Sequence, residues 1–470
     1  MRTAPPEAAA GTILFVDLDS VLATVDLSWE ALAGLCKARP WCALALPAWL
    51  FQGKNHAKKQ IAQRARLNAA RLLYRNDVLE FLRAEKEAGT ALVLAAAPDR
   101  MFAKEIAEHL GLFSAVLGGD DAASLEGRRK LAEIQELKTS RIHGPTADAP
   151  LGLSLCRMAD GTGLLARPAR DASPAKFTAL KLRSVWRALR PRQWAKNLLV
   201  FLPFLLAHLW GDLDSLGRAF GAFVSFSLCA SGVYVVNDLL DLEADRAHPR
   251  KRDRPFASGA LPIWSGLLLG PALVGAGLLS AGLFSAPLAQ VVAIYSVAAV
   301  AYSIYLKQIL IVDVVVLAGL YALRILAGGA AANVFISPWL VAFSLFLFFS
   351  LAFVKRYSEI VRAQGTGAEP PLGRGYLRPD IDLIRTAGLT SGYLAVLVLA
   401  LYVNSKEVMA LYRNPQMLWM ACPLLIYWIS RVWFLANRGV VDDDPLTFAL
   451  ADSATYAVGV LLALAAFMAI

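Results

Sequence analysis

The chain has 470 residues, of which 57% are hydrophobic and only 18% are charged. A soluble globular protein would carry about 25% charged residues, so the composition excludes a wholly soluble chain. The formal net charge is +10, but the bases lie at the ends of apolar segments rather than on one soluble face. This distribution argues against nucleic-acid binding and favours anionic lipid and phosphorylated substrates as partners. The five cysteines are scattered without a CxxC pair, so they predict neither a zinc site nor a disulfide framework.

Residues 1–185 have the pattern of a soluble α/β domain. Short buried strands are predicted at 12–17 and 91–97, and a helix at 100–110. Strands that alternate with helices imply a parallel sheet, with functional residues at the carboxyl ends of its strands. The segment 29–74 is helical and basic, and we expect a cap or a surface near lipid headgroups. Because no secretory signal is recognisable in MRTAPPEAAAG, this domain is expected in the cytosol.

Residues 186–470 predict an all-α polytopic membrane bundle. About nine apolar segments lie near 197–211, 216–236, 264–284, 287–305, 310–331, 338–354, 386–403, 417–436 and 450–470. Before the first of them, Trp194 and the bases of RPRQWAKN predict an interfacial helix. The bases concentrate in alternate loops, which places those loops in the cytoplasm by the positive-inside rule. We therefore expect an integral protein of a bacterial inner (plasma) membrane, with its soluble domain and active-site loops on the cytoplasmic side.

The most charge-dense stretch of the apolar half is residues 237–259, NDLLDLEADRAHPRKRDRPFASG. Asp238, Asp241 and Asp245 are spaced i, i+3, i+7, which on a helix places them on one face. Converging carboxylates suit Mg²⁺, which usually shares its oxygen ligands with substrate phosphates. The bases that follow suit phosphate oxygens: Arg246, Arg250, Lys251, Arg252 and Arg254. The stretch predicts a diphosphate site, whereas a solvated loop that only sets topology would explain the bases but not the regular acids.

Further polar residues lie in or beside the apolar segments. Arg324 lies within the fifth segment, where we expect a substrate or carboxylate contact rather than lipid snorkelling. Lys355 and Arg356 end the sixth segment, where they either bind substrate or only set topology. Other candidates for substrate binding or catalysis are Arg192, Lys196, Tyr302, Lys307 and Asp313.

The N-terminal domain resembles the haloacid dehalogenase-like, Rossmannoid phosphatases. The resemblance implies that Asp17 is the nucleophile, Asp19 a general acid/base and Lys130 the phosphate-binding lysine. Of the acids in the metal-binding segment only Asp148 remains, because Gly144 stands where the first acid is expected. Two interpretations stay open: an altered phosphatase, or a degenerate fold retained for packing or regulation.

The NDxxDxxxD pattern, within about nine apolar segments, resembles the UbiA superfamily of intramembrane prenyltransferases. The resemblance covers residues 187–470 and implies a lipid-open cavity and acid-rich cytosolic loops that hold a diphosphate through Mg²⁺. RPRQWAKN, the 237–259 stretch and YSIYLK followed by Asp313 are similar to the polyprenyl-phosphate phosphoribosyltransferase branch. Aromatic prenyltransferases usually carry a second acid pair, and only Asp313 stands at that place.

The resemblance implies transfer of a phosphoribosyl group from phosphoribosyl pyrophosphate to a polyprenyl phosphate. Mg²⁺ would be held by Asp238, Asp241 and Asp245, with Asn237 orienting a ligand or the donor. One alternative is transfer of a polyprenyl group from its diphosphate to an aromatic acceptor of a quinone or haem pathway. Another is a non-enzymatic lipid-binding or transport protein. A tethered phosphatase acting on the phosphoribosyl product is a further hypothesis, and a homo-oligomer is left open.

Overall fold

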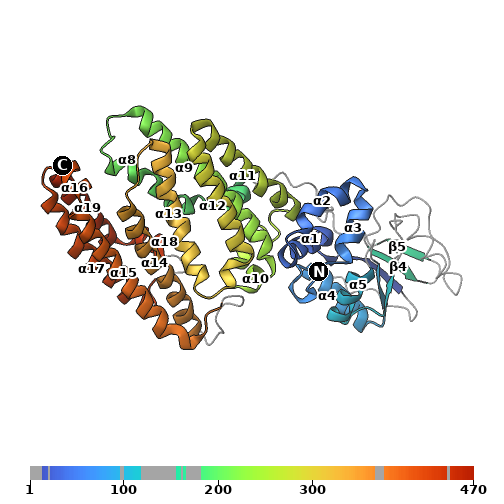
Figure 1. The fold of residues 1–470 in the computed structure, drawn as a ribbon. Coiled ribbons are helices and arrows are strands. Elements are labelled where there is room, and N and C mark those ends of the chain that lie inside the picture. Colours follow the sequence, from blue (N-terminus) through green and yellow to red (C-terminus); the bar gives the residue numbers. More distant parts are fainter. Residues whose placement is uncertain are drawn as a thin grey trace. The chain divides into compact units, whose positions relative to one another are not determined.

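A computed structural model of the chain describes residues 13–18, 22–95, 100–117, 155–159, 162–165, 182–365, 375–441 and 445–470. The chain divides into two compact units (Figure 1), each described by itself below. The first unit comprises Met1–Ala188 and Asp238–Leu268, and the second comprises Leu189–Asn237 and Leu269–Ile470. Most of the predicted diphosphate stretch therefore packs with the N-terminal part of the chain.

A five-stranded sheet of order β3-β2-β1-β4-β5 forms the centre of the first unit. Its strands are β1 (Ile13–Asp17), β2 (Ala91–Ala95), β3 (Ala115–Leu117), β4 (Leu155–Ala159) and β5 (Thr162–Leu165). β1 and β2 are parallel, with Ile13 opposite Ala91, which confirms the predicted parallel pairing of these two strands, and β3 extends the sheet in the same direction. β4 pairs with β1 in the antiparallel sense, a pairing that alternation of strands and helices in the sequence does not predict.

Helices of the first unit follow the predicted pattern closely. The basic insert contains α1 (Leu27–Ala38), α2 (Cys42–Phe51), α3 (Lys54–Ala62) and the 3-10 helix η2 (Ala69–Arg71). α1 begins where the side chain of Asp26 accepts a hydrogen bond from the Ser28 backbone N–H. α4 (Asn76–Glu87) precedes β2, and α5 (Arg100–Leu110) coincides with the predicted helix. One buried core joins strands and helices through residues such as Val16, Leu32, Leu82, Leu94 and Ile106.

Seven helices of the described residues are long and apolar enough to cross a membrane. Five are α9 (Leu213–Leu240), α11 (Ile263–Phe284), α12 (Ala286–Ile304), α13 (Val312–Ala332) and α14 (Pro338–Gly365). The other two are the continuous segments Arg378–Val403, which contains α15 (Ile381–Val403), and Pro415–Asn437, which contains α17 (Ala421–Asn437). The chain is therefore an integral membrane protein with a helical polytopic bundle.

The prediction of about nine spans differs from this result at both ends of the bundle. The first apolar segment forms the 3-10 helix η3 (Pro191–Phe201) and the five-residue α8 (Leu202–Leu206) instead of one α-helix. The last forms α18 (Pro445–Ala451) and α19 (Ser453–Ala469), separated at Asp452, which caps α19 through its side chain. Hydrophobicity alone therefore overestimated the number of continuous spans.

Shorter elements connect the spans. They are α7 (Leu182–Leu189), α10 (Leu242–Ala247), η4 (Lys251–Asp253), η5 (Leu306–Gln308), η6 (Arg378–Asp380), α16 (Lys406–Leu411) and η7 (Pro415–Met420). Within the second unit, η3 packs closely against α13, where a Cβ atom on Gly328 would overlap the carbonyl oxygen of Val200. Close packing of an irregular segment against a helix thus depends on a glycine at this position.

Gly328→Ala is predicted to destabilise the second unit by about 1–3 kcal/mol, because the added methyl group forces η3 and α13 apart. Gly319→Ala on the same helix is the matched control, since a Cβ atom there meets open space. Thermal unfolding of the purified variants in detergent checks this. Equal midpoints for the two variants would contradict the close contact.

Candidate functional site

The acid-rich stretch does not form one continuous helix. α9 ends at Leu240, Asp241 is the N-cap of α10, and the backbone of Asp241 (φ −98°, ψ 14°) leaves the helical conformation. The prediction that three carboxylates share one helical face is therefore wrong. The interruption at Asp241 redirects the chain, and contacts beyond the helix determine which carboxylates come together.

Asp238 and Asp245 share one cationic side chain. Nη1 of Arg254 lies 3.2 Å from Oδ1 of Asp238 and 2.5 Å from Oδ2 of Asp245. The two acidic side chains are only 2% and 4% exposed, respectively. Burial raises the pKa of the Asp245 carboxyl, and the adjacent Arg254 opposes that rise. Two poorly solvated carboxylates thus converge on a position where positive charge is favourable.

Asp241 contacts a different cation. Its Oδ1 lies 3.9 Å from Nζ of Lys37 on α1, and both side chains are partly exposed. Asp241 is therefore more accessible than the two carboxylates that Arg254 holds.

The donor set fits Mg²⁺ shared with a phosphorylated ligand. No group of three acidic, histidine or cysteine side chains within the described residues is close enough to form a complete metal cage. Mg²⁺ is commonly held by one or two carboxylates, with substrate phosphates and water supplying the other oxygens. The Asp238 and Asp245 pair meets that requirement.

The bases of the stretch have different surroundings. Arg246 is buried against Glu30 of α1, whereas Arg250 is exposed. Backbone N–H groups of Arg250 and Lys251 donate to Nδ1 of His248 at 3.2 and 3.4 Å, which organises the turn after α10. Asn237 lies in the last turn of α9, directly before Asp238. The bases predicted to suit phosphate oxygens thus include both buried and accessible side chains.

A second polar cluster lies in the second unit. Arg356 of α14 donates to Oδ2 of Asp313 at 2.5 Å, and the hydroxyl of Tyr376 donates to its Oδ1 at 2.5 Å. Arg356 also donates to the hydroxyl of Tyr302 at 2.8 Å and to Glu359 at 2.7 Å. The structure thereby joins Tyr302, Asp313 and Arg356, which the sequence suggested separately. Tyr376 and Glu359 were missed, because nothing in their local sequence marks them.

Lys355 and Lys307 flank the residues of this cluster in the sequence. Lys355 precedes Arg356 on α14, and Lys307 lies in η5 between Tyr302 and Asp313. Both are partly exposed, unlike Arg356, which is buried. Of the two basic residues that end the sixth apolar segment, Lys355 is thus the more accessible.

Arg324 is buried within α13 and is satisfied by neutral groups. Its guanidinium donates to Oδ1 of Asn197 at 2.8 Å, to the Leu320 carbonyl at 2.5 Å and to the Tyr295 hydroxyl at 3.1 Å. Aromatic faces of Phe226, Tyr295 and Tyr321 lie 5.7, 4.9 and 5.3 Å from it, respectively. These contacts exclude lipid snorkelling, and they consist of an amide, a carbonyl, a hydroxyl and rings rather than a carboxylate.

The segment before the first span contributes a buried amide that sequence analysis missed. Asn197 donates to the Ser227 hydroxyl at 3.0 Å while it accepts from Arg324. Lys196 lies over the Tyr321 ring at 5.8 Å, and Arg192 is exposed. The final Asn of RPRQWAKN therefore fixes α9 and α13 through their side chains.

Candidate phosphatase residues of the N-terminal domain are barely covered by the structure. Asp17 is the last residue of β1, at the carboxyl end of the strand, as predicted. The side chain of Asp17 and the whole of Asp19, Lys130, Gly144 and Asp148 lie outside the described residues.

Fold and site together define a polytopic membrane protein with an acid-and-base segment after its first long apolar helix. The profile of the UbiA prenyltransferase family matches residues 198–459, which is more than half of the chain. The chain therefore belongs to the UbiA prenyltransferase family.

Similar proteins extend this finding. An uncharacterized protein of Sinorhizobium fredii, y4nM, is 32% identical over 97% of this chain and 90% of its own length. The decaprenyl-phosphate phosphoribosyltransferase of Mycobacterium tuberculosis is 40% identical over 42% of this chain and 65% of its own length. A solved UbiA homologue of Archaeoglobus fulgidus, bound to GPP and Mg²⁺, is 18% identical. It covers 60% of this chain and 96% of its own, with a TM-score of 0.46.

Arg356→Gln is predicted to destabilise the second unit by about 3–5 kcal/mol, because it leaves the carboxylate of Asp313 buried without its cation. Arg385→Gln is the control: its partner Asp382 is exposed, so the change should stay within about 0.5 kcal/mol. Thermal unfolding in detergent measures both. A midpoint for Arg356→Gln equal to that of the control would show that the buried pair does not matter for folding.

Proposed function

We propose that the chain is a Mg²⁺-dependent membrane transferase that moves a phosphoribosyl group from phosphoribosyl pyrophosphate to a polyprenyl phosphate. The observation that carries this proposal is the pair of buried carboxylates, Asp238 and Asp245, converging on one cationic position. The similarity to a decaprenyl-phosphate phosphoribosyltransferase supports the choice of donor and acceptor.

The proposed chemistry needs little beyond binding and charge neutralisation. Asp238 and Asp245, with Asp241 beside them, hold the metal, which when bound neutralises charge on the leaving pyrophosphate. Arg254, Arg250 and Lys251 hold phosphate oxygens of the donor. The bond from the anomeric carbon to pyrophosphate breaks, pyrophosphate keeps the electron pair, and a phosphate oxygen of the lipid bonds to that carbon. That oxygen is already ionised, so no general base is required.

Residues of the second unit are proposed to bind the phosphate of the acceptor lipid or to position neighbouring side chains. The bases proposed for the lipid phosphate are Arg192, Lys196, Lys307 and Lys355, whereas Arg324 is buried and its guanidinium donates to Asn197, Leu320 and Tyr295. Asp313 is proposed as the single acid of the second acidic position, acting with Tyr302 and Arg356 to shape that region. Asn237 is proposed to orient a ligand or the donor next to Asp238.

The second candidate function is transfer of a polyprenyl group from its diphosphate to an aromatic acceptor. The description of the matching family as prenyltransferases favours it. It would use the same carboxylates, because both donors carry a diphosphate. The two functions therefore differ in the donor that is consumed rather than in the metal site.

The proposal also covers the cellular location of the protein and the role of its N-terminal domain. We place the protein in a bacterial inner membrane, with the segment from Asn237 to Gly259 facing the cytoplasm, because its bases obey the positive-inside rule. Hydrolysis of a product 5-phosphate by the N-terminal domain, at residues 1–185, is a separate proposal that depends on Asp17 and Asp19.

The direct test supplies purified protein in lipid nanodiscs with radiolabelled phosphoribosyl pyrophosphate, polyprenyl phosphate and Mg²⁺. We expect labelled lipid from the wild-type chain. Transfer should be slower by about 100-fold or more in Asp238→Asn and in Asp245→Asn, because each variant loses a negative charge that binds the metal. Asp253→Asn is the matched control, because Asp253 is an exposed acid of the same segment. Label entering an aromatic acceptor from a prenyl diphosphate, with none from phosphoribosyl pyrophosphate, would replace this function with the second one.

A further inference from the structure

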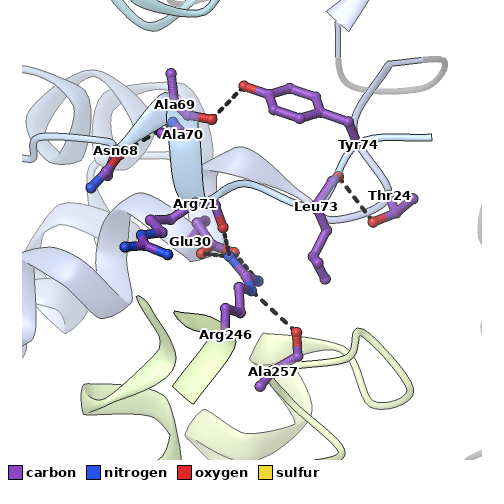
Figure 2. A network of polar contacts seen from close by, with 10 residues as sticks. All are labelled: Thr24, Glu30, Asn68, Ala69, Ala70, Arg71, Leu73, Tyr74, Arg246 and Ala257. Carbon is purple, nitrogen blue, oxygen red and sulfur yellow. Dashed lines mark hydrogen bonds and ion pairs between the residues drawn. The ribbon is translucent and has the colours of Figure 1, made fainter. Parts of the chain in front are cut away.

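Arg246 is held by the N-terminal part of the chain (Figure 2). Its guanidinium forms a two-pronged ion pair with Glu30 of α1, at 2.5 and 3.0 Å. It also donates to the carbonyl oxygens of Arg71 at 3.1 Å and Ala257 at 3.2 Å. Both side chains of the ion pair are only 5% exposed. Arg246 is therefore fully engaged as a structural clamp, and it is not free to bind a phosphate.

The clamp is one of several contacts between the N-terminal part and the acid-rich segment. Seven residues after Glu30 on the same helix, Lys37 lies 3.9 Å from Asp241. Glu30 thus contacts a base near the end of α10, and Lys37 lies near the acid at its N-cap position. Farther along, Arg187 of α7 donates to the carbonyl oxygen of Asp253 at 3.0 Å.

The acid-rich segment needs such external support. α10 has six residues and η4 has three, lengths at which isolated helices are unstable in water. Asp245 precedes Arg246 directly, and Asp241 occupies the N-cap position of the same short helix. A displacement of Arg246 is therefore expected to displace Asp245, which the proposed function assigns to the metal.

The ion pair is suited to positioning rather than to general stability. A buried ion pair gains little net stability, because removing both charges from water opposes their attraction. Burial accordingly raises the pKa of the Glu30 carboxyl, although Arg246 is adjacent. The bidentate geometry of the Glu30–Arg246 ion pair nevertheless fixes the distance and the orientation between these two side chains.

We propose that helix α1 is a positioning element of the transferase site, in which Glu30 holds Arg246 and thereby sets the carboxylates of Asp241 and Asp245 for the metal. The inference rests on the proposed function. It gives the N-terminal domain a role in the transfer reaction that does not require hydrolysis of any phosphate. Glu30 and Lys37 act on the metal through other residues, in the way that outer-shell partners of metal ligands do.

The test uses the full-length chain in nanodiscs and compares Glu30→Gln with Glu80→Gln, an exposed acid of α4 in the same unit. Mn²⁺ binding is followed by electron paramagnetic resonance, and hydrogen exchange of residues 241–259 is measured in EDTA. Glu30→Gln should weaken Mn²⁺ binding per folded molecule by about 10- to 100-fold and speed exchange in this segment. Glu80→Gln should change neither quantity.

Lys37→Gln gives a second variant on a partly exposed position, in case Glu30→Gln does not fold. Loss of its positive charge beside Asp241 should tighten Mn²⁺ binding by about threefold at low salt. Mn²⁺ affinities equal to that of the wild type in the folded variants would overturn the inference. Failure of the proposed function is distinguishable, because it shows in the wild-type chain as absence of phosphoribosyl transfer.

Discussion

Buried charge that must be compensated is the constraint on which this molecule depends. Carboxylates of Asp238 and Asp245 are almost inaccessible to water, and an isolated buried carboxylate is strongly unfavourable. Arg254 supplies the compensating charge, and it reaches both acids because the chain turns back after α10. The same requirement that holds this turn together creates a place for a second cation, which is the basis of the proposed chemistry.

Three other buried charges are compensated in different ways, and the differences separate their roles. Arg356 and Asp313 pair directly, and Tyr302, Tyr376 and Glu359 satisfy their remaining groups, so these residues form a closed network. Arg324 is compensated by neutral oxygens and aromatic faces. Arg246 is compensated by Glu30 of the N-terminal part. Two sites place two carboxylates beside one base. Asp313 and Glu359 lie beside Arg356, which is buried, and Asp238 and Asp245 lie beside Arg254, which is partly exposed and is the site to which the proposed function assigns the metal.

Much of the fold could be predicted from the sequence, because hydrophobic periodicity is local. The helix at Arg100–Leu110 and the parallel pairing of β1 with β2 followed from it. Breaks within apolar runs could not be predicted in this way, since the apolar run 197–211 is divided between the 3-10 helix Pro191–Phe201 and the short α8. Hydropathy indicates whether a segment prefers lipid or water. It does not indicate the backbone conformation that packing against neighbouring helices imposes on the segment.

The candidate site was predictable in composition but not in arrangement. The spacing of Asp238, Asp241 and Asp245 identified the acids, but the break at Asp241 made a different pair converge. Glu30 lies more than 200 residues before Arg246, a separation (|i−j| = 216) across which no local pattern can act. Asn197 and Tyr376 were missed for the same reason, because their importance arises from partners on distant helices.

The most direct measurement for the central claim is a structure of the wild-type chain with Mn²⁺ and phosphoribosyl pyrophosphate, in which anomalous scattering locates the metal. The account predicts a metal peak about 2.1 Å from carboxylate oxygens of Asp238 and Asp245, the distance that small divalent cations require. It also predicts that Arg254 turns from these carboxylates to the diphosphate. A structure with the donor bound elsewhere, and with Arg254 still between the two carboxylates without a metal peak, would contradict it.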